Sequence, residues 1–327
     1  MKRDLYADEY PQSWFCVAPI KSLKNGGVQD LDALGKKLVM YRTQSGAVHI
    51  AERFCPHMGA SLGQGHVAGE NLVCPFHHWE YGADGACNKI PYLDKVPSRA
   101  CLETFPVVEH LGFIWMWNGD APSYALPDMP EASDAGYGYR AKTQAFDIHP
   151  LLILENGCDA QHFKYVHKVN FTRYDVDVTK EDAHEFAFDV NQEMPGPVGT
   201  KIVLRTSIHY VGAGAIFGAL AFRGKQTCRF IAAPLPVGHG KTRFHLIVLP
   251  KRLPKPLFFV DPIYQWYFAR QLFLGSTDDY LPIWRHMDTS RRGVLVEDDR
   301  LQQRYRRFYE DHFVPPPPQQ NVLPIVA

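Results

Sequence analysis

Two groups of residues have the types and spacing that could hold iron. The first group is Cys55-Pro-His57 together with Cys74-Pro-Phe-His77. Two thiolates and two imidazoles can hold a [2Fe–2S] cluster with histidines on one of its two irons, which raises the reduction potential above that of an all-cysteine cluster. This group therefore predicts an electron-transfer centre.

A zinc site of the Cys2His2 type needs the same residue types and is the alternative reading of this group. Zinc fingers usually keep the two cysteines together and the two histidines together, whereas here each loop carries one of each. Pro56 and Pro75 stiffen the two loops, and Gly59 and Gly63 allow the backbone to approach closely and donate amide hydrogens to sulfur. These features favour the cluster.

The second group is Asn156, Asp159, His162 and His167. Two imidazoles that still require a carboxylate are typical of mononuclear non-haem Fe(II) oxygenase sites. The histidines are five positions apart in the sequence, which is not the spacing of one helical face, so the pair alone also fits a structural role. Asn156, Asp159 and the upstream group together favour iron. Asp159 is predicted to orient His162 or to carry a proton near it, rather than to be a solvated helix carboxylate.

Short β segments with frequent turn signals occupy residues 14–117, and a proline-rich stretch follows them. We expect a metal-binding domain over residues 1–120, a linker over 121–137 and a second domain over 138–327. The second domain begins with a strand at 139–146, and apolar spacing predicts one helix over 151–168. Further strands are expected at 202–209, 228–233 and 243–249, and helices at 263–274, 280–287 and 294–309. The fold class is α+β.

Composition and cysteine usage limit the partners and the location. Lys plus Arg total 35, as do Asp plus Glu, so no net charge points to nucleic acid or an anionic membrane. The seven cysteines are dispersed, and the N-terminus is too polar for a secretory signal, so we expect a reduced, cytoplasmic protein. No apolar run is long enough to predict a transmembrane helix. The glycines over 212–218 lack the helix and the acidic residue of a dinucleotide site.

With both motifs in this order, the chain resembles the oxygenase component of the Rieske non-haem iron oxygenases over nearly its whole length. The stretch 55–117 is most similar to the 3-ketosteroid 9α-hydroxylase and cholesterol desaturase branch. The resemblance implies an all-β Rieske domain followed by a helix-grip catalytic domain, assembled as a head-to-tail homotrimer. Electrons would then cross from the cluster of one subunit to the iron of the next, with Asp159 between a cluster histidine and His162.

The resemblance also implies the site residues. Cys55, His57, Cys74 and His77 would hold the cluster, and His162 and His167 would bind the catalytic iron. The third ligand in the family is an aspartate on a C-terminal helix. Asp279 is our choice, although Tyr280-Leu-Pro-Ile-Trp284 after it is one residue longer than the family pattern. Three other carboxylates therefore stay open as the third ligand: Asp278, Asp298 and Asp299.

These expectations describe a terminal oxygenase that uses O2 to hydroxylate, demethylate or desaturate an apolar ring-containing substrate. A separate NAD(P)H-dependent reductase, with or without a ferredoxin, would supply the electrons. The alternative within the class is cis-dihydroxylation of an arene. The alternative from another class is a Rieske electron carrier without a catalytic iron.

Overall fold

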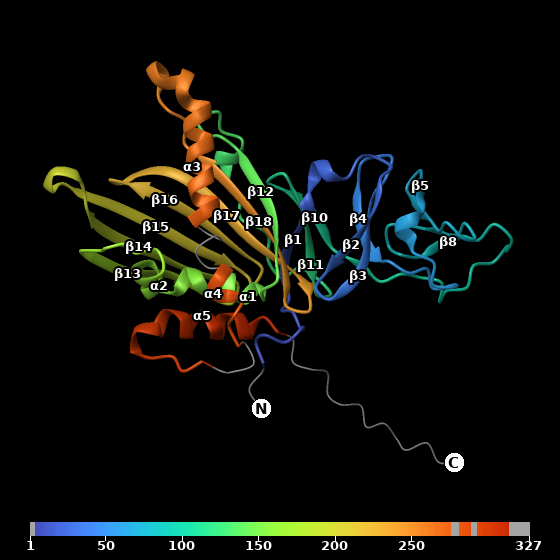
Figure 1. Ribbon diagram of the computed structural model, residues 1–327. Helices are drawn as coiled ribbons and strands as arrows, with labels where there is room; N and C mark the ends of the chain where they lie inside the picture. The colour runs from blue at the N-terminus through green and yellow to red at the C-terminus, as the bar shows by residue number, and fades with distance from the viewer. Residues whose placement is uncertain (1–3, 276–280, 289–292, 314–327) are drawn as a thin grey trace, which may run out of the picture.

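The computed structural model describes residues 4–275, 281–288 and 293–313 of the 327-residue chain. The molecule is elongated, with small sheets at one end and a large sheet at the other (Figure 1). Within the described residues, no helix is both long enough and apolar enough to span a membrane. The expected α+β class is confirmed, because a mostly β region precedes a region in which helices pack on one large antiparallel sheet.

Three small antiparallel sheets form the N-terminal region, and they contain the strands predicted over 14–117. Their strand orders are β1-β11-β10, β2-β3-β4-β9 and β5-β6-β7-β8. The strands are β1 (Ser13–Pro19), β2 (Val28–Ala33), β3 (Lys36–Arg42), β4 (Val48–Glu52), β5 (His66–Ala68), β6 (Asn71–Val73), β7 (Glu80–Tyr81), β8 (Cys87–Lys89), β9 (Thr104–Phe105), β10 (Val107–His110) and β11 (Phe113–Asn118). Single-turn 3-10 helices lie at Ile20–Ser22 and Leu62–Gln64.

A seven-stranded antiparallel sheet forms the C-terminal region, in the order β12-β18-β17-β16-β15-β14-β13. Long strands with alternating apolar residues bury one face of this sheet under helices. The strands are β12 (Arg140–Phe146), β13 (Arg173–Glu181), β14 (Glu185–Pro195), β15 (Lys201–Val211), β16 (Ala215–Phe222), β17 (Lys225–Gly238) and β18 (Lys241–Pro250). The expected strands at 139–146, 202–209, 228–233 and 243–249 are confirmed. The sequence analysis did not identify β13 or β14.

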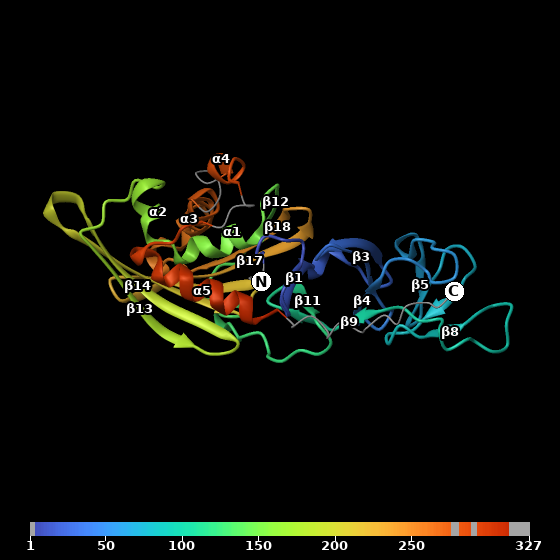
Figure 2. The ribbon, with the colours of Figure 1, turned by 90° about the horizontal axis from the view of Figure 1, so that it is seen from below.

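Helices α1, α2 and α5 lie over the same face of the large sheet (Figure 2). The helices are α1 (Pro150–Glu155), α2 (Ala160–Tyr165), α3 (Asp261–Gly275), α4 (Leu281–Trp284) and α5 (Arg300–Asp311). Further 3-10 helices lie at Pro130–Ala132, Asn156–Cys158, Pro197–Gly199, Lys255–Val260 and Glu297–Asp299. The expected helix over 263–274 is confirmed. The one expected over 294–309 is wrong at its start, because the α-helix begins at Arg300 after a 3-10 turn.

The prediction of one helix over 151–168 is wrong. Helix α1 ends at Glu155, and a 3-10 turn and the extended residue Asp159 precede α2. Gly157 lies at this break, where an added Cβ would be 2.5 Å from the hydroxyl oxygen of Tyr210 on β15. That hydroxyl donates a 2.6 Å hydrogen bond to the carbonyl of Leu154. The chain turns here because the end of α1 is held against the sheet.

The N-terminal and C-terminal regions share a hydrophobic core. Trp115 on β11 is fully buried and stacks on Phe217 of β16, with ring centroids 6.1 Å apart. The turn between β15 and β16 approaches β1 so closely that a Cβ on Gly214 would be 2.1 Å from the carbonyl oxygen of Trp14. The glycines over 212–218 therefore serve a turn and a strand. The shared core fixes the two regions relative to each other.

Candidate metal centres

The two cysteine loops have the same backbone conformation. In each loop the cysteine amide donates to the carbonyl five residues later, from Cys55 to Ala60 and from Cys74 to Trp79, both at 2.9 Å. In each loop the cysteine carbonyl also accepts from the amide four residues later, that of Gly59 at 2.9 Å and that of His78 at 3.2 Å. Gly59 and His78 both have the left-handed conformation, with φ of 73° and 57°. Two equivalent loops present two equivalent ligand pairs.

The four predicted cluster ligands lie together, and their burial differs by type. Cys55 and Cys74 are 2% and 1% exposed. His57 is exposed and His77 is half-buried, and their ring centroids are 4.7 Å apart. His57 also stacks on Trp79 at 4.5 Å. The thiols therefore lie inside the domain while the imidazoles lie near its surface, where an electron could leave toward another protein.

The thiol of Cys74 has the surroundings that a cluster ligand needs. Burial raises the pKa of this thiol, and the amides of Phe76 and His77, which hydrogen-bond to the sulfur, oppose that increase. The thiol of Cys55 lies within hydrogen-bonding reach of Cys74, and its sulfur is 3.0 Å from the hydroxyl of Tyr81. Amide and hydroxyl donors to sulfur stabilise thiolates and raise the potential of a cluster. The donor set fits a [2Fe–2S] cluster.

Among the residues that the structure describes, no three histidine, cysteine, aspartate or glutamate side chains meet as ligands of one metal ion. A [2Fe–2S] cluster with two histidines needs only two protein ligands on each iron. Two thiolates and two imidazoles, each set close together, meet that requirement. The assignment of Cys55, His57, Cys74 and His77 as ligands stays a prediction.

The predicted catalytic histidines lie at and beyond the end of α2. Asp159 caps this helix, because its carboxylate accepts from the amides of Gln161 at 2.9 Å and His162 at 3.2 Å. The rings of His162 and His167 have centroids 5.5 Å apart. His167 follows the last turn of α2, so the two histidines do not share a helical face, as their spacing indicated. The loop after the helix returns the second imidazole toward the first.

His162 is in the protonation state that a metal ligand requires. It is 7% exposed, and its burial, opposed by the carboxylate of Asp159, lowers its pKa to about 4. The imidazole is therefore neutral near pH 7 and has a lone pair available for a metal. Together with His167, it supplies two of the three protein ligands of a facial Fe(II) site.

An ion pair fixes the helix that precedes this site. Glu155, at the end of α1, is 4% exposed and pairs with Arg306 of α5, with Oε1 and Nε 2.5 Å apart. The hydroxyl of Tyr6 donates to the other carboxylate oxygen at 3.1 Å. Asn156, which follows Glu155 directly, lines the same cavity as His162. Segments from both ends of the chain therefore hold the start of the predicted iron site.

A cavity of about 450 Å³ lies between the histidine pair and the large sheet. His162 and His167 both line it, and most of the remaining lining is hydrocarbon. Its volume is in the range that holds a small organic ligand. The lining residues are Ile153, Asn156, Gly157, His162, Phe163, His167, Val169, Phe171, Gln192, Met194, Leu204, Thr206, Ile208, Ile216, Leu220, Phe230, Ala232, Phe244, Leu246, Val248 and Trp284.

The position of the carboxylate ligand stays a prediction. Asp279, our choice, and Asp278 lie outside the described residues. Asp298 accepts a 3.5 Å hydrogen bond from the side chain of Gln161, next to His162. Asp299 accepts from the amide of Val296 at 2.9 Å, as the cap of a 3-10 turn.

The sequence analysis did not identify two side chains of the cavity. Gln192 belongs to β14, which was not predicted, although the period-two pattern from Phe186 places it on the apolar face. Trp284 on α4 is 7% exposed and lines the cavity. It was noted only as part of the pattern after Asp279. A polar residue in register with buried apolar ones was the available signal for Gln192.

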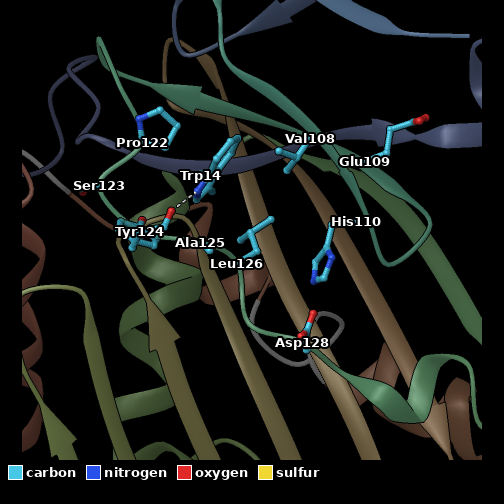
Figure 3. Close-up of a pocket in the computed structure, with 10 residues that line it drawn as sticks. All are labelled: Trp14, Val108, Glu109, His110, Pro122, Ser123, Tyr124, Ala125, Leu126 and Asp128. Atoms are coloured by element: carbon cyan, nitrogen blue, oxygen red, sulfur yellow. Dashed lines mark hydrogen bonds between the residues drawn. The ribbon is translucent and has the colours of Figure 1, made fainter.

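A second depression, of about 560 Å³, lies where β10 meets the segment 122–128 (Figure 3). None of the predicted iron ligands lines it. The indole of Trp14 donates to the carbonyl of Tyr124 at 2.8 Å, and Nε2 of His110 is 2.9 Å from the carbonyl oxygen of Pro127. These contacts hold the connecting segment against the N-terminal sheets, so the depression belongs to the junction between the regions.

The two predicted metal centres lie toward opposite ends of the molecule. The cysteine loops, one between β4 and β5 and one between β6 and β7, belong to the end with the small sheets, and α2 lies beneath the large sheet toward the other end (Figure 1). The shared core between the two regions fixes this separation. The two centres of one chain are therefore not side by side. Because direct electron transfer slows steeply with distance, transfer between them within one chain would be slow.

Comparisons with families of known proteins give one match for each of the two regions. Residues 13–106 match the Rieske [2Fe-2S] domain. Residues 114–313 match the 3-ketosteroid 9alpha-hydroxylase C-terminal domain. The first match assigns a Rieske [2Fe–2S] domain to the region with the cysteine loops, and the second covers the large sheet and its helices.

Two relatives align with this chain over both regions, and a third aligns with part of it. A cholesterol 7-desaturase of Xenopus laevis is 28% identical over 93% of this chain and 72% of its own length. The 3-ketosteroid-9-alpha-monooxygenase oxygenase component of Rhodococcus rhodochrous is 26% identical over 93% of this chain and 82% of its own. A cholesterol 7-desaturase of Bombyx mori is 36% identical over 56% of this chain, which spans only 45% of that protein.

Solved structures agree on the fold. The crystal structure of dicamba monooxygenase bound to dicamba superposes with a TM-score of 0.74 and is 22% identical, over 92% of this chain and 96% of that one. At this identity the likeness concerns the arrangement of strands and helices. It extends over both regions of the molecule.

Proposed function

Because the chain belongs to the family of Rieske oxygenases with a 3-ketosteroid 9α-hydroxylase C-terminal domain, we propose that it is the terminal oxygenase of a multicomponent system. It would hydroxylate, demethylate or desaturate an apolar ring-containing molecule. The relatives named as steroid monooxygenase and cholesterol desaturase suggest a polycyclic compound.

One observation carries the proposal: the histidine pair opens onto an apolar cavity of about 450 Å³. A protein that only carries electrons needs no cavity beside a second metal site. A cavity with mostly hydrocarbon walls suits a substrate that is itself largely hydrocarbon. The alternative of an electron carrier without catalytic iron is therefore disfavoured.

The residues of this chain have separate tasks in the proposed reaction. When bound, the cluster supplies single electrons and the ferrous ion supplies activation of dioxygen. Cys55, Cys74, His57 and His77 would hold the first group. His162, His167 and Asp279 would hold the second. The walls of the cavity exclude water and hold the substrate beside the histidines.

Asp159 would act between subunits. Its carboxylate caps α2 beside His162 and is only half-buried, so its second oxygen can reach another protein surface. We propose a head-to-tail homotrimer in which His57 or His77 of one subunit meets Asp159 of the next. The opposite placement of the two centres supports this proposal, because a neighbouring subunit can bring a cluster close to the iron.

A separate NAD(P)H-dependent reductase, with or without a ferredoxin, would supply the electrons, since we found no nicotinamide motif in the sequence. The exposed imidazole of His57 suits docking of such a partner. The dispersed cysteines, none of which forms a disulfide, suit the cytoplasm as the location.

Electron paramagnetic resonance of the reduced protein tests the proposal. A Rieske cluster should give its characteristic low-average-g signal, and oxygen uptake with a surrogate reductase should depend on an added polycyclic substrate. A reduced sample without the signal would rule the proposal out.

A mixture of two inactive variants tests the trimer. Cys74→Ala removes a cluster ligand, and His162→Ala removes an iron ligand. Neither variant alone should turn over. A random equimolar mixture should recover about a quarter of the activity, because each trimer that contains both chains has one competent pair of sites out of about three. Mixed trimers, isolated through two different tags, that remain inactive would contradict electron transfer between subunits.

A further inference from the structure

Gln192 is a buried polar side chain on the wall of the large apolar cavity. It lies on β14 and is 5% exposed. Strand residues alternate between faces, so Val190, Gln192 and Met194 share one face of the sheet. Val190 is buried in the apolar core between this face and the helices, and Met194 lines the cavity. The carboxamide of Gln192 therefore occupies a position where its strand otherwise presents hydrocarbon.

No hydrogen bond to the carboxamide of Gln192 is made by residues 4–275, 281–288 or 293–313. Buried side-chain amides almost always have a partner. The partner of Gln192 must then come from the cavity that it lines. Water can serve when the cavity holds no substrate, and a group on the substrate must serve when that water is displaced.

The chemistry of the surrounding wall limits what this group can be. Two residues with hydroxyl groups neighbour Gln192 on the sheet. Tyr174 on β13 is paired directly with Gln192, and Thr206 on β15 is diagonal to it, because β15 pairs Leu204 with Gln192 and Thr206 with Val190. The described lining includes no lysine, arginine, aspartate or glutamate. A charged substrate group would be buried there without a counter-ion, which is costly. A neutral oxygen is the acceptable partner.

We propose that Gln192 selects and orients the substrate by donating a hydrogen bond from Nε2 to a neutral oxygen, a ketone or a hydroxyl, on an otherwise apolar ring compound. The inference deepens the proposed function and rests on it. A single polar anchor in a hydrocarbon cavity fixes which end of the substrate lies at Gln192. It thereby fixes which carbon lies beside His162 and His167.

The cavity should discriminate strongly against substrates that lack this oxygen. A substrate without the oxygen displaces water from Gln192 and leaves the carboxamide without a partner, so binding is weakened. A substrate with the oxygen replaces the lost water. Thr206 can serve as a second, weaker contact because its hydroxyl is on the same face of the sheet.

Binding of two matched compounds to the iron-loaded protein without reductase tests the inference. The probes are a tetracyclic steroid ketone and the isosteric compound in which C=CH2 replaces C=O. Their dissociation constants can be measured by quenching of tryptophan fluorescence, because Trp284 lines the cavity. The wild-type protein should bind the ketone about tenfold more tightly than its isostere.

Gln192→Met keeps the length of the side chain and removes its hydrogen bonds. This variant should lose the tenfold preference. The ketone should bind more weakly because it loses its donor, whereas the isostere should bind at least as tightly as before because no carboxamide is left without a partner. Met194→Leu, on the same face of β14, is the control and should keep the preference. A variant that merely disturbed the cavity would weaken both compounds equally.

A preference that survives in Gln192→Met, or a wild-type protein that shows no preference or binds neither probe, would overturn the inference. The paramagnetic signal and the iron content are measured on the same samples. A wild-type protein that has both centres intact but shows no preference would refute the role of Gln192 alone, whereas missing iron would refute the proposed function.

Discussion

The two ends of the molecule use cysteine and histidine in different ways. At the cluster end, four predicted ligands come from two short loops of equal conformation, and the imidazoles reach the surface. At the catalytic end, a histidine pair beside a buried cavity depends on a helix break, a sheet and α5. A site built from local loops can be recognised in the sequence. A site assembled from distant segments depends on the whole fold.

Removal of one ligand at each end should separate the two functions most strongly. His162→Ala should reduce oxygen-dependent turnover by at least about 100-fold and leave the Rieske signal intact, because the cluster loops do not contact α2. Cys74→Ala should abolish the signal as well as turnover. Paramagnetic resonance and oxygen uptake measure the two effects. Turnover that survives in His162→Ala would show that His162 is not required at the catalytic end.

Asp159→Asn tests the proposed link between the two ends. Asparagine caps a helix as well as aspartate does, so α2 and iron binding should be retained. Loss of the charge beside His162 should lower turnover by about 10-fold to 100-fold. Single-turnover measurements on the pre-reduced protein would detect the slower step. Asp159→Ala is the comparison, since it also removes the cap. Unchanged turnover in Asp159→Asn would leave Asp159 with a structural role only.

Stability below neutral pH should reveal the buried histidines of the C-terminal region. His245 on β18 is 1% exposed, and burial lowers its pKa to about 3; burial also lowers the pKa of His149 to about 4. Below pH 6.5 the unfolded chain binds protons that the folded chain does not, so stability falls as the pH falls. The free energy of unfolding should decrease by about 1–2 kcal/mol per histidine between pH 6.5 and pH 5.

Chemical denaturation at several pH values checks this dependence, above the range where carboxylates titrate. His245→Gln should reduce the slope by up to about a third, since His149 and His162 still contribute. An equal slope in His245→Gln and wild-type protein would show that His245 is not held neutral by the fold.

The smallest effect concerns the equivalence of the two cluster loops. His78 occupies the left-handed position that Gly59 occupies in the other loop. A side chain in this conformation costs about 1 kcal/mol, although histidine tolerates it better than most residues. His78→Gly should therefore leave the Rieske signal unchanged and raise stability by up to about 1 kcal/mol. Gly59→Ala, the reciprocal change, should lower stability. Loss of the signal in His78→Gly would give His78 a role in the cluster itself.

The extent to which the sequence predicted each end follows from the same comparison. The strands and cysteine loops of the N-terminal region were predicted because their signals are local, with turns and ligands a few residues apart. The helix over 151–168 was predicted as continuous because the constraint at Gly157 comes from Tyr210, a residue of a distant strand. Gln192 was missed for a similar reason, since its importance depends on the cavity that it faces.

Iron content per chain tests the central claim, which is that a Rieske cluster and a separate catalytic iron belong to one polypeptide. The purified protein should contain three irons and two acid-labile sulfides per chain, with about two irons in His162→Ala and about one in Cys74→Ala. Two irons in both the wild-type protein and His162→Ala, or zinc in place of iron, would contradict the account.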